Sequence, residues 1–220
     1  MMKAIIFDLD GVIVSTDEYH YQAWKRLAEE EHIPYSREMN MLQRGVSRME
    51  SLEVMLKEIC KSYTTEQKSE MAQRKNGYYV ELIKNITSAD ILPGVSKFLG
   101  DCKNSRILCA IGSSSKNTAA ILKGIGLYDF FDTIADGTMI KNSKPHPEVF
   151  LLAAEKLHVE PCYCIVVEDA EAGLKAAKAA GMIALAVGAA KGSPTADISV
   201  ASLADIGATD LISGKMGTLL

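Results

Sequence analysis

Two aspartates near the amino terminus have the spacing of a metal-assisted nucleophilic site. Asp8 and Asp10 interrupt an apolar run that begins at Ala4, and Gly11 follows them. A spacing of two residues places both carboxylates on the same side of an extended segment as it leaves a sheet. Acids this close repel each other unless they share a proton or a hard cation such as Mg²⁺. The pair indicates a Mg²⁺ site, although the short motif is equally typical of a calcium-loop fragment or an ordinary turn.

A run of hydroxyl side chains follows the apolar segment 107–112. Hydroxyl groups and backbone N–H groups at the start of a helix form a natural phosphate cradle. We therefore expect Ser113, Ser114 and Asn117 to bind a phosphate. The alternative is a plain helix cap, in which a serine oxygen accepts a backbone hydrogen bond.

A lysine and a second acidic pair follow further along the chain. Lys144 precedes Pro145 near the start of a predicted helix, where it could neutralise a transferring phosphoryl group and its nucleophile. Glu168 and Asp169 end the apolar segment 163–167 and would complete the metal site. Taken singly, the lysine is more typical of a solvated surface and the acids of a helix N-terminus.

The elements that must position these residues alternate along the chain. Apolar runs without polar alternation predict buried parallel strands, at residues 4–10, 107–112, 163–168 and 183–188. Helical patterns lie between them, at about 94–103, 116–124, 146–157 and 170–180. This alternation predicts an α/β fold with a Rossmann-like, doubly wound parallel sheet. Ligands bind at the carboxyl ends of the strands in such a sheet, where the acids, the hydroxyl groups and the lysine would meet.

Residues 17–85 break this alternation. Three helical patterns follow one another there, at about 17–31, 48–61 and 65–84, with no convincing strand among them. The sequence therefore predicts an all-helical cap of residues 14–91, inserted into a catalytic core of residues 1–13 and 92–220. Pro93-Gly94 marks a turn where the core resumes.

Composition limits the classes of partner. The 220 residues carry a net charge of -4, and this acidic balance argues against a generic grip on nucleic acid or anionic membranes. The apolar runs are far shorter than a membrane span. The chain has an odd number of cysteines, namely Cys60, Cys102, Cys109, Cys162 and Cys164. Their number and spacing predict reduced thiols in a cytoplasmic protein. We also expect the protein to be a monomer.

In combination, these motifs resemble the haloacid dehalogenase superfamily over nearly the whole chain. The motifs are Asp8-Leu9-Asp10-Gly11-Val12, Ser113, Lys144-Pro145 and Glu168-Asp169. The resemblance implies that Asp8 forms an aspartyl-phosphate and that Asp10 is the general acid/base. It also implies a Mg²⁺ cofactor bound by Asp8, Asp10, Glu168 and Asp169. The dehalogenases of this superfamily lack the second aspartate, so Asp10 favours phosphoryl transfer.

The helical insertion resembles the cap of the β-phosphoglucomutases, a family within that superfamily. Three segments carry this resemblance, namely 16–24, 44–51 and 74–76, which include the cations Arg44, Arg48 and Lys75. The resemblance implies substrate-binding residues in the cap, which are His20, Trp24, Gly45, Val46, Ser47, Arg48, Ser51, Lys75 and Asn76. It further implies interconversion of β-glucose 1-phosphate and glucose 6-phosphate through β-glucose 1,6-bisphosphate.

On this resemblance, Arg48 binds the phosphate that is not transferred, Lys75 contacts the substrate, and His20 couples cap closure to Asp10. Arg48 and Lys75 could instead be solvated charges, and Trp24 could equally be a packing residue. The sequence departs from the cap pattern at Ser15 and Met49, where acids are usual, and Ser114 replaces an alanine.

Two other functions stay open at this stage. One is a sugar-phosphate phosphatase of the same superfamily, in which water rather than a sugar hydroxyl takes the phosphoryl group. The other is a phosphate-sensing protein without turnover, because a fold by itself does not determine function.

Overall fold

The computed structural model describes residues 2–57, 59 and 62–213 of the chain. A parallel sheet of six strands forms its centre, in the spatial order β3-β2-β1-β4-β5-β6. The strands are β1 (Ala4–Phe7), β2 (Leu108–Gly112), β3 (Thr133–Ala135), β4 (Cys164–Glu168), β5 (Ile183–Ala186) and β6 (Ile198–Ser199). The strand order reverses between β1 and β4, and ligands of open α/β sheets bind outside the carboxyl ends of the strands at such a point.

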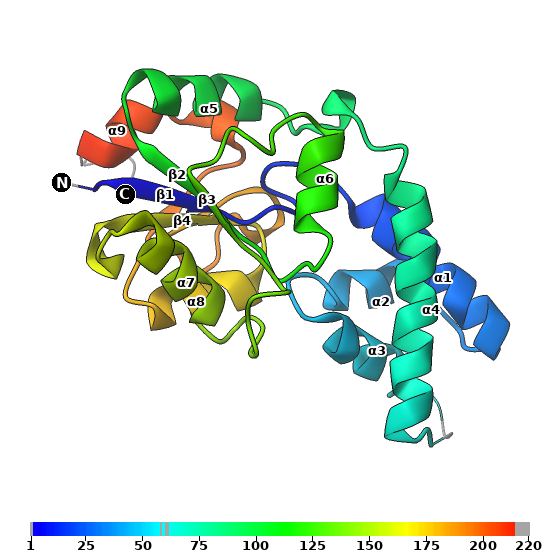
Figure 1. Cartoon of the computed structure of the whole chain (residues 1–220). Coiled ribbons are helices and arrows are strands. Elements are labelled where there is room, and N and C mark those ends of the chain that lie inside the picture. The colour runs from blue at the N-terminus through cyan, green and yellow to red at the C-terminus, as the bar shows by residue number, and fades with distance from the viewer. Residues whose placement is uncertain (1, 58, 60–61, 214–220) are drawn as a thin grey trace.

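Helices cover both faces of the sheet, as Figure 1 shows. One layer holds α5 (Val95–Asn104), α6 (Thr118–Gly124) and α9 (Ala208–Ser213), and the other holds α7 (Glu148–Leu157) and α8 (Glu171–Ala179). In β1, Ile5 and Phe7 face the first layer whereas Ala4 and Ile6 face the second. All four side chains are buried, which explains why the strand is apolar at every position.

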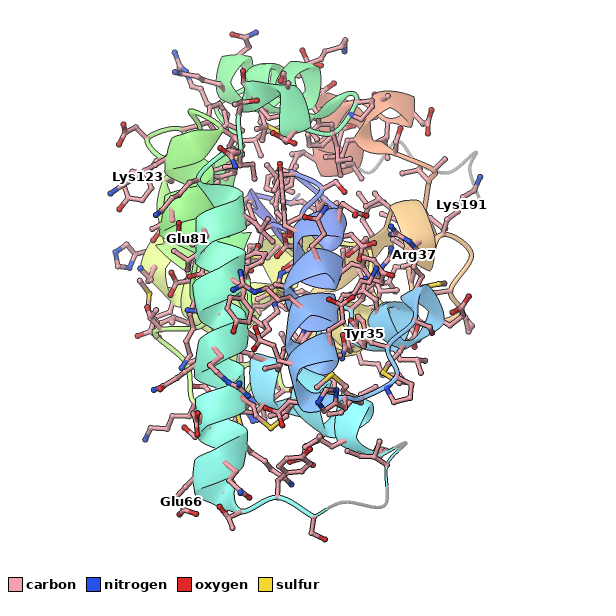
Figure 2. All side chains as sticks on the ribbon, turned by 90° about the vertical axis from the view of Figure 1, so that its right-hand side faces the viewer. Tyr35, Arg37, Glu66, Glu81, Lys123 and Lys191 are labelled. Atoms are coloured by element: carbon pink, nitrogen blue, oxygen red, sulfur yellow. The ribbon has the colours of Figure 1, made fainter. Side chains whose placement is uncertain are left out.

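In the described part of the chain, four α-helices follow β1 and form a cap over the carboxyl edge of the sheet (Figure 1). They are α1 (Asp17–Glu31), α2 (Arg37–Leu42), α3 (Arg48–Leu56) and α4 (Thr65–Ile83). Figure 2 shows α1 and α4 side by side. The cap has an apolar cluster of its own, which includes Trp24, Leu27, Leu52 and Met55.

The two chain segments that join cap and core run next to each other. Val14 and Ile91 form an antiparallel bridge, and Leu92 N–H donates to the carbonyl of Ile13 at 3.0 Å. These contacts lie at the ends of the cap segment 14–91 expected from the sequence, although the division into two domains stays a prediction.

The predicted α/β fold is confirmed, and the differences from the expected elements are local. The first strand ends at Phe7 rather than at residue 10, because the chain turns at Gly11, whose φ is 78°. The helix expected over 48–61 ends at Leu56, and residues 58, 60 and 61 lie outside the described part of the chain. Two strands, β3 and β6, were not expected because three and two residues are too few to form an apolar run.

The helix α2 was also not expected. It has six residues and begins after Ser36, whose side chain accepts a hydrogen bond from Met39 N–H. Among the described residues no helix has the length and apolar character needed to cross a membrane. The cysteines that the structure describes as free thiols are Cys102, Cys109, Cys162 and Cys164, and Cys60 lies outside the described residues.

Candidate active site

A buried lysine joins two acids at the carboxyl edge of the sheet. Lys144 Nζ lies 2.5 Å from Oδ1 of Asp8 and 3.1 Å from Oε2 of Glu168. Asp8 follows β1 and Glu168 ends the neighbouring strand β4, so the parallel pairing of these strands brings the acids together. The side chains of Lys144 and Glu168 are 1% and 0% exposed. Lys144 is therefore not the solvated surface charge that the sequence left open.

The charge state of this cluster depends on mutual compensation. Burial alone would lower the pKa of Lys144, but the carboxylates of Asp8 and Glu168 outweigh burial and raise this pKa above its usual value. Burial raises the pKa of Glu168 well above its usual value, while Lys144 opposes that change. Lys144 is thus held as a cation by the two acids, while burial favours the protonated form of Glu168.

Three carboxylates of this edge have the arrangement of a site for a hard cation. Oxygen atoms of Asp8, Glu168 and Asp169 lie within 4.8 Å of one another. Oε1 of Glu168 is buried and has no hydrogen-bond partner among the described residues. A buried carboxylate oxygen without a partner is unfavourable, and a divalent cation would satisfy it. Asp10, the fourth predicted ligand, lies outside this group of three, and its role as a ligand stays a prediction.

Two glycines make room for the acidic side chains. At Gly11 a Cβ atom would overlap the carboxylate of Asp169, and the positive φ there already favours glycine. At Gly173, in the first turn of α8, a Cβ atom would overlap the carboxyl group of Glu168. The sequence analysis did not identify Gly173, because nothing local signals how closely a side chain from β4 approaches it.

Asp10 is placed to exchange protons. The hydroxyl of Thr16 donates to Oδ1 of Asp10. Burial, with a smaller contribution from the charge of Asp8, raises the pKa of Asp10 to about 7. Burial, with Asp8 and Asp10, also raises the pKa of Asp169 to about 7. A carboxyl group that titrates near neutrality can act both as an acid and as a base.

The serine-rich segment forms a compact turn beside Asp8. Ser113 is 2% exposed, and its Oγ accepts a hydrogen bond from Ser115 N–H at 3.1 Å. Ser115 Oγ in turn accepts from Asn117 N–H at 3.2 Å. The helix α6 begins at Thr118, and no side chain caps it at Asn117, so the serine oxygens accept backbone hydrogen bonds in the turn that precedes the helix. Ser114 Oγ is buried without a hydrogen-bond partner among the described residues.

The cap contributes a second buried lysine. Lys75 is 2% exposed, and its Nζ lies 2.7 Å from Nδ1 of His20. It also lies 4.9 Å from the ring centre of Trp24 and 4.7 Å from that of Tyr79. Burial and the nearby Arg48 lower the pKa of Lys75 well below its usual value. Lys75 is therefore not a solvated helix charge, and it faces the acidic centre from the cap side.

Trp24 packs within the cap and also borders the cavity, so its contact with the substrate stays a prediction. Its side chain belongs to the apolar cluster of the cap and is 2% exposed. The same residue also lines the cavity between cap and core.

The loop before α3 brings the cap into contact with the core. Gly45 has a φ of 73°, and a Cβ atom there would lie 2.8 Å from Cβ of Ala170 in the core. Ser47 caps α3 in a reciprocal arrangement with Glu50. Arg48, the first residue of α3, is half-buried, and burial lowers its pKa. Asn76 of α4 accepts a hydrogen bond from Asn117 Nδ2 at 3.0 Å, a second contact between cap and core.

A cavity of about 910 Å³ lies between cap and core and collects these groups. All site residues predicted from the sequence line it except Glu168, which is fully buried at the base of the acidic cluster. Further polar residues that the prediction of binding residues omitted also line it, among them Thr16, Asp17, Asn40, Arg44, Tyr79 and Lys116. Lys116 stands next to the serine segment, so its position in the motif was a signal that could have identified it.

Comparison with known proteins places this chain among phosphate-handling enzymes. The family model for haloacid dehalogenase-like hydrolases matches residues 2–181. The β-phosphoglucomutase of Bacillus subtilis is 44% identical over 93% of this chain and 92% of its own length. A phosphorylated carbohydrates phosphatase of Thermotoga maritima is 33% identical over 82% of each chain. The crystal structure of β-phosphoglucomutase from Clostridium difficile superposes with a TM-score of 0.90 at 43% identity, covering 98% of this chain and 97% of that one.

Proposed function

The chain belongs to the haloacid dehalogenase-like hydrolase family, and we propose that it is a β-phosphoglucomutase that interconverts β-glucose 1-phosphate and glucose 6-phosphate. The observation that carries this proposal is the arrangement inside one cavity. The nucleophile Asp8 lies on the core side, while Lys75 and Arg48 lie on the cap side. A mutase needs both sides, because a substrate with two phosphates must be held while one of them reacts. The choice of glucose as the sugar rests on the similarity to the Bacillus subtilis β-phosphoglucomutase, which extends over most of both chains.

Asp8 is the proposed nucleophile. Its carboxylate forms a bond to phosphorus while the bond from phosphorus to the sugar oxygen breaks, which yields an aspartyl-phosphate. Lys144 lies against the Asp8 carboxylate and offsets the negative charge of the transferring group. Mg²⁺, bound by Asp8, Glu168 and Asp169, would supply further neutralisation of that charge.

Asp10 is the proposed general acid/base. It takes the proton from the C6 hydroxyl of β-glucose 1-phosphate as that oxygen attacks the phosphoryl group on Asp8. The intermediate β-glucose 1,6-bisphosphate then reorients so that its C1 phosphate faces Asp8. Asp8 accepts the phosphoryl group from C1, and Asp10 returns the proton to the C1 oxygen. The pKa of Asp10 near 7 suits both directions of proton transfer.

The cap residues hold the phosphate that is not reacting. Arg48 would bind it by charge, and Ser113, Ser114 and Asn117 would bind the phosphate at Asp8. Ser114 Oγ, which has no hydrogen-bond partner in the described part of the chain, is available as a donor to a phosphate oxygen. We further propose that the enzyme acts as a monomer in the cytoplasm, on free sugar phosphates.

An isomerisation assay tests this function. The purified protein is given Mg²⁺, β-glucose 1-phosphate and a trace of β-glucose 1,6-bisphosphate, while glucose 6-phosphate and free phosphate are followed together. We expect glucose 6-phosphate without matching phosphate release, and no product from the Asp8→Asn variant. Stoichiometric phosphate release would instead identify a sugar-phosphate phosphatase.

A further inference from the structure

An ion pair inside the cap holds one arginine in a defined position. Arg44, in the loop between α2 and α3, donates from Nη2 to Oδ2 of Asp17 at 2.9 Å and from Nε to Oδ1 at 3.2 Å. Asp17 is the first residue of α1. The two parallel hydrogen bonds fix the guanidinium plane as well as its distance. Both side chains are about one-third exposed and line the cavity.

A buried network supports this ion pair. Oδ1 of Asp17 also accepts from Nδ2 of Asn40 at 2.9 Å. The hydroxyl of Tyr35 lies 3.0 Å from Oδ1 of Asn40 and 2.6 Å from Oε1 of Gln43, and Gln43 Nε2 donates to the carbonyl of Ser51 at 2.8 Å. Figure 2 shows Tyr35 beside α1. The network therefore ties α1 to both ends of the loop that contains Arg44.

The other side of this loop faces the core. Gly45 packs against Ala170, where a Cβ atom would lie within 2.8 Å of the Ala170 methyl group. The side-chain hydrogen bond with Asp17 raises the pKa of Arg44, and the charge of Asp169 adds to this effect across the boundary between cap and core. The positive charge of Arg44 is thus attracted by Asp169 of the acidic centre, while the hydrogen bonds with Asp17 fix the position of the guanidinium group within the cap.

We propose that Arg44, braced by Asp17, is a positioning residue that holds the cap closed over the acidic centre and so keeps water away from the phosphoryl group on Asp8. This inference rests on the proposed mutase function. It assigns roles to two residues that lie outside the catalytic and phosphate-binding groups described above.

The Asp17–Arg44 ion pair lowers the entropic cost of closing the cap. Opening the cap would separate Arg44 from Asp169 and Gly45 from Ala170, whereas the Asp17–Arg44 pair lies within the cap and would stay intact. An arginine that is already ordered loses little conformational freedom when the cap closes. A phosphoryl group on Asp8 adds negative charge to the core side and strengthens the attraction for Arg44.

Three variants test the proposal, namely Asp17→Asn, Arg44→Gln and the double variant. The matched control is Arg37→Gln. It removes the exposed ion pair between Arg37 of α2 and Glu18, the neighbour of Asp17 on α1, whose atoms lie 2.9 Å apart. The first measurement is the ratio of free phosphate to glucose 6-phosphate formed from β-glucose 1-phosphate. The second is acrylamide quenching of Trp24, the single tryptophan of the chain, in the protein without substrate.

We expect each single variant to raise the ratio of phosphate to glucose 6-phosphate by about five- to tenfold and to increase quenching of Trp24. The double variant should be no worse than the single ones, because the two residues act as one unit. Arg37→Gln should match the wild type in both measurements. Thermal unfolding of each variant checks that the fold is intact.

Wild-type values of the product ratio and of quenching in both single variants would overturn the proposal. So would effects that simply add in the double variant. If the wild-type protein forms no glucose 6-phosphate, the proposed function fails. The quenching measurement still tests whether Asp17 and Arg44 keep the cap closed, since it does not depend on turnover.

Discussion

Nζ of Lys144 lies 2.5 Å from Oδ1 of Asp8, although 136 positions separate the two residues along the chain. Both side chains are buried, and the same lysine reaches Glu168 on the next strand. The contact shows that the proposed nucleophile and its counter-charge are held together before any substrate arrives. Preorganised charge of this kind costs no rearrangement during the reaction.

Replacement of Lys144 by methionine should impair both stability and turnover. The variant keeps the apolar stem but leaves Asp8 and Glu168 buried without their cation. Removal of one partner from a buried pair costs about 3–5 kcal/mol at neutral pH. We expect kcat to fall by about 100- to 1,000-fold. Urea unfolding at pH 7 and at pH 5 checks the cause. Burial raises the pKa of Glu168, so its protonation at the lower pH should recover part of the stability. An equal loss at both pH values would contradict this explanation.

A methyl group at Gly173 should weaken metal binding. In Gly173→Ala the added Cβ would overlap the carboxyl group of Glu168 and displace it. We expect the Mg²⁺ concentration for half-maximal activity to rise by about 10- to 100-fold.

The matched control for this change is Gly100→Ala. Gly100 lies in α5, and a Cβ atom there would meet nothing within 4 Å. This variant should keep the Mg²⁺ dependence and gain about 0.5–1 kcal/mol of stability. Equal Mg²⁺ dependence in the two alanine variants would argue against a tight fit around Glu168.

Stability without metal should fall as pH rises toward neutrality. Burial and neighbouring acids raise the pKa of Asp10 and of Asp169 from 3.8 to about 7, so the folded protein binds these protons more tightly than the unfolded chain. The free energy of unfolding therefore decreases between about pH 4 and pH 7. Added Mg²⁺ should offset this decrease, because the cation binds the deprotonated acids.

Melting temperatures measured in a metal chelator across this range test the prediction. Asp169→Asn removes one of the two groups, so its melting temperature should depend less steeply on pH. An unchanged slope in this variant would show that Asp169 titrates near its ordinary pKa.

His20 should remain neutral over the working pH range. Burial, Lys75 and Arg48 lower the pKa of His20 well below its usual value. Nδ1 of His20 lies 2.7 Å from Nζ of Lys75, so the ring can accept a hydrogen bond from the lysine. His20→Ala removes this partner of the buried Lys75 amine and should lower kcat by about 10- to 100-fold.

The glutamine variant separates hydrogen bonding from titration. His20→Gln retains an acceptor and should recover much of kcat. The acid limb of its pH–rate profile should coincide with that of the wild type, and a displaced limb would show that His20 itself titrates.

Much of the fold and of the acidic centre could be predicted from the sequence. Apolar runs marked four of the strands, and their carboxyl ends carry Asp8, Ser113 and Glu168. In a parallel sheet these ends meet at one edge, so the position of a residue just after a strand predicts its neighbours in space. The short elements β3, β6 and α2 could not be found in this way, because two to six residues are too few to establish a periodicity.

The amino-acid sequence by itself therefore determined the architecture and the kinds of chemical group at the site. Tertiary structure decided which of these groups are buried and which partners they contact. Packing of α1 against α4 buries Lys75 beside His20, and the core encloses Lys144, although either lysine read from the sequence could have been a surface charge. It also decided that Asp17 braces Arg44 and that Gly173 makes room for Glu168. Burial and partner choice depend on segments far apart in the chain, whereas strands and helices follow from the order of neighbouring residues.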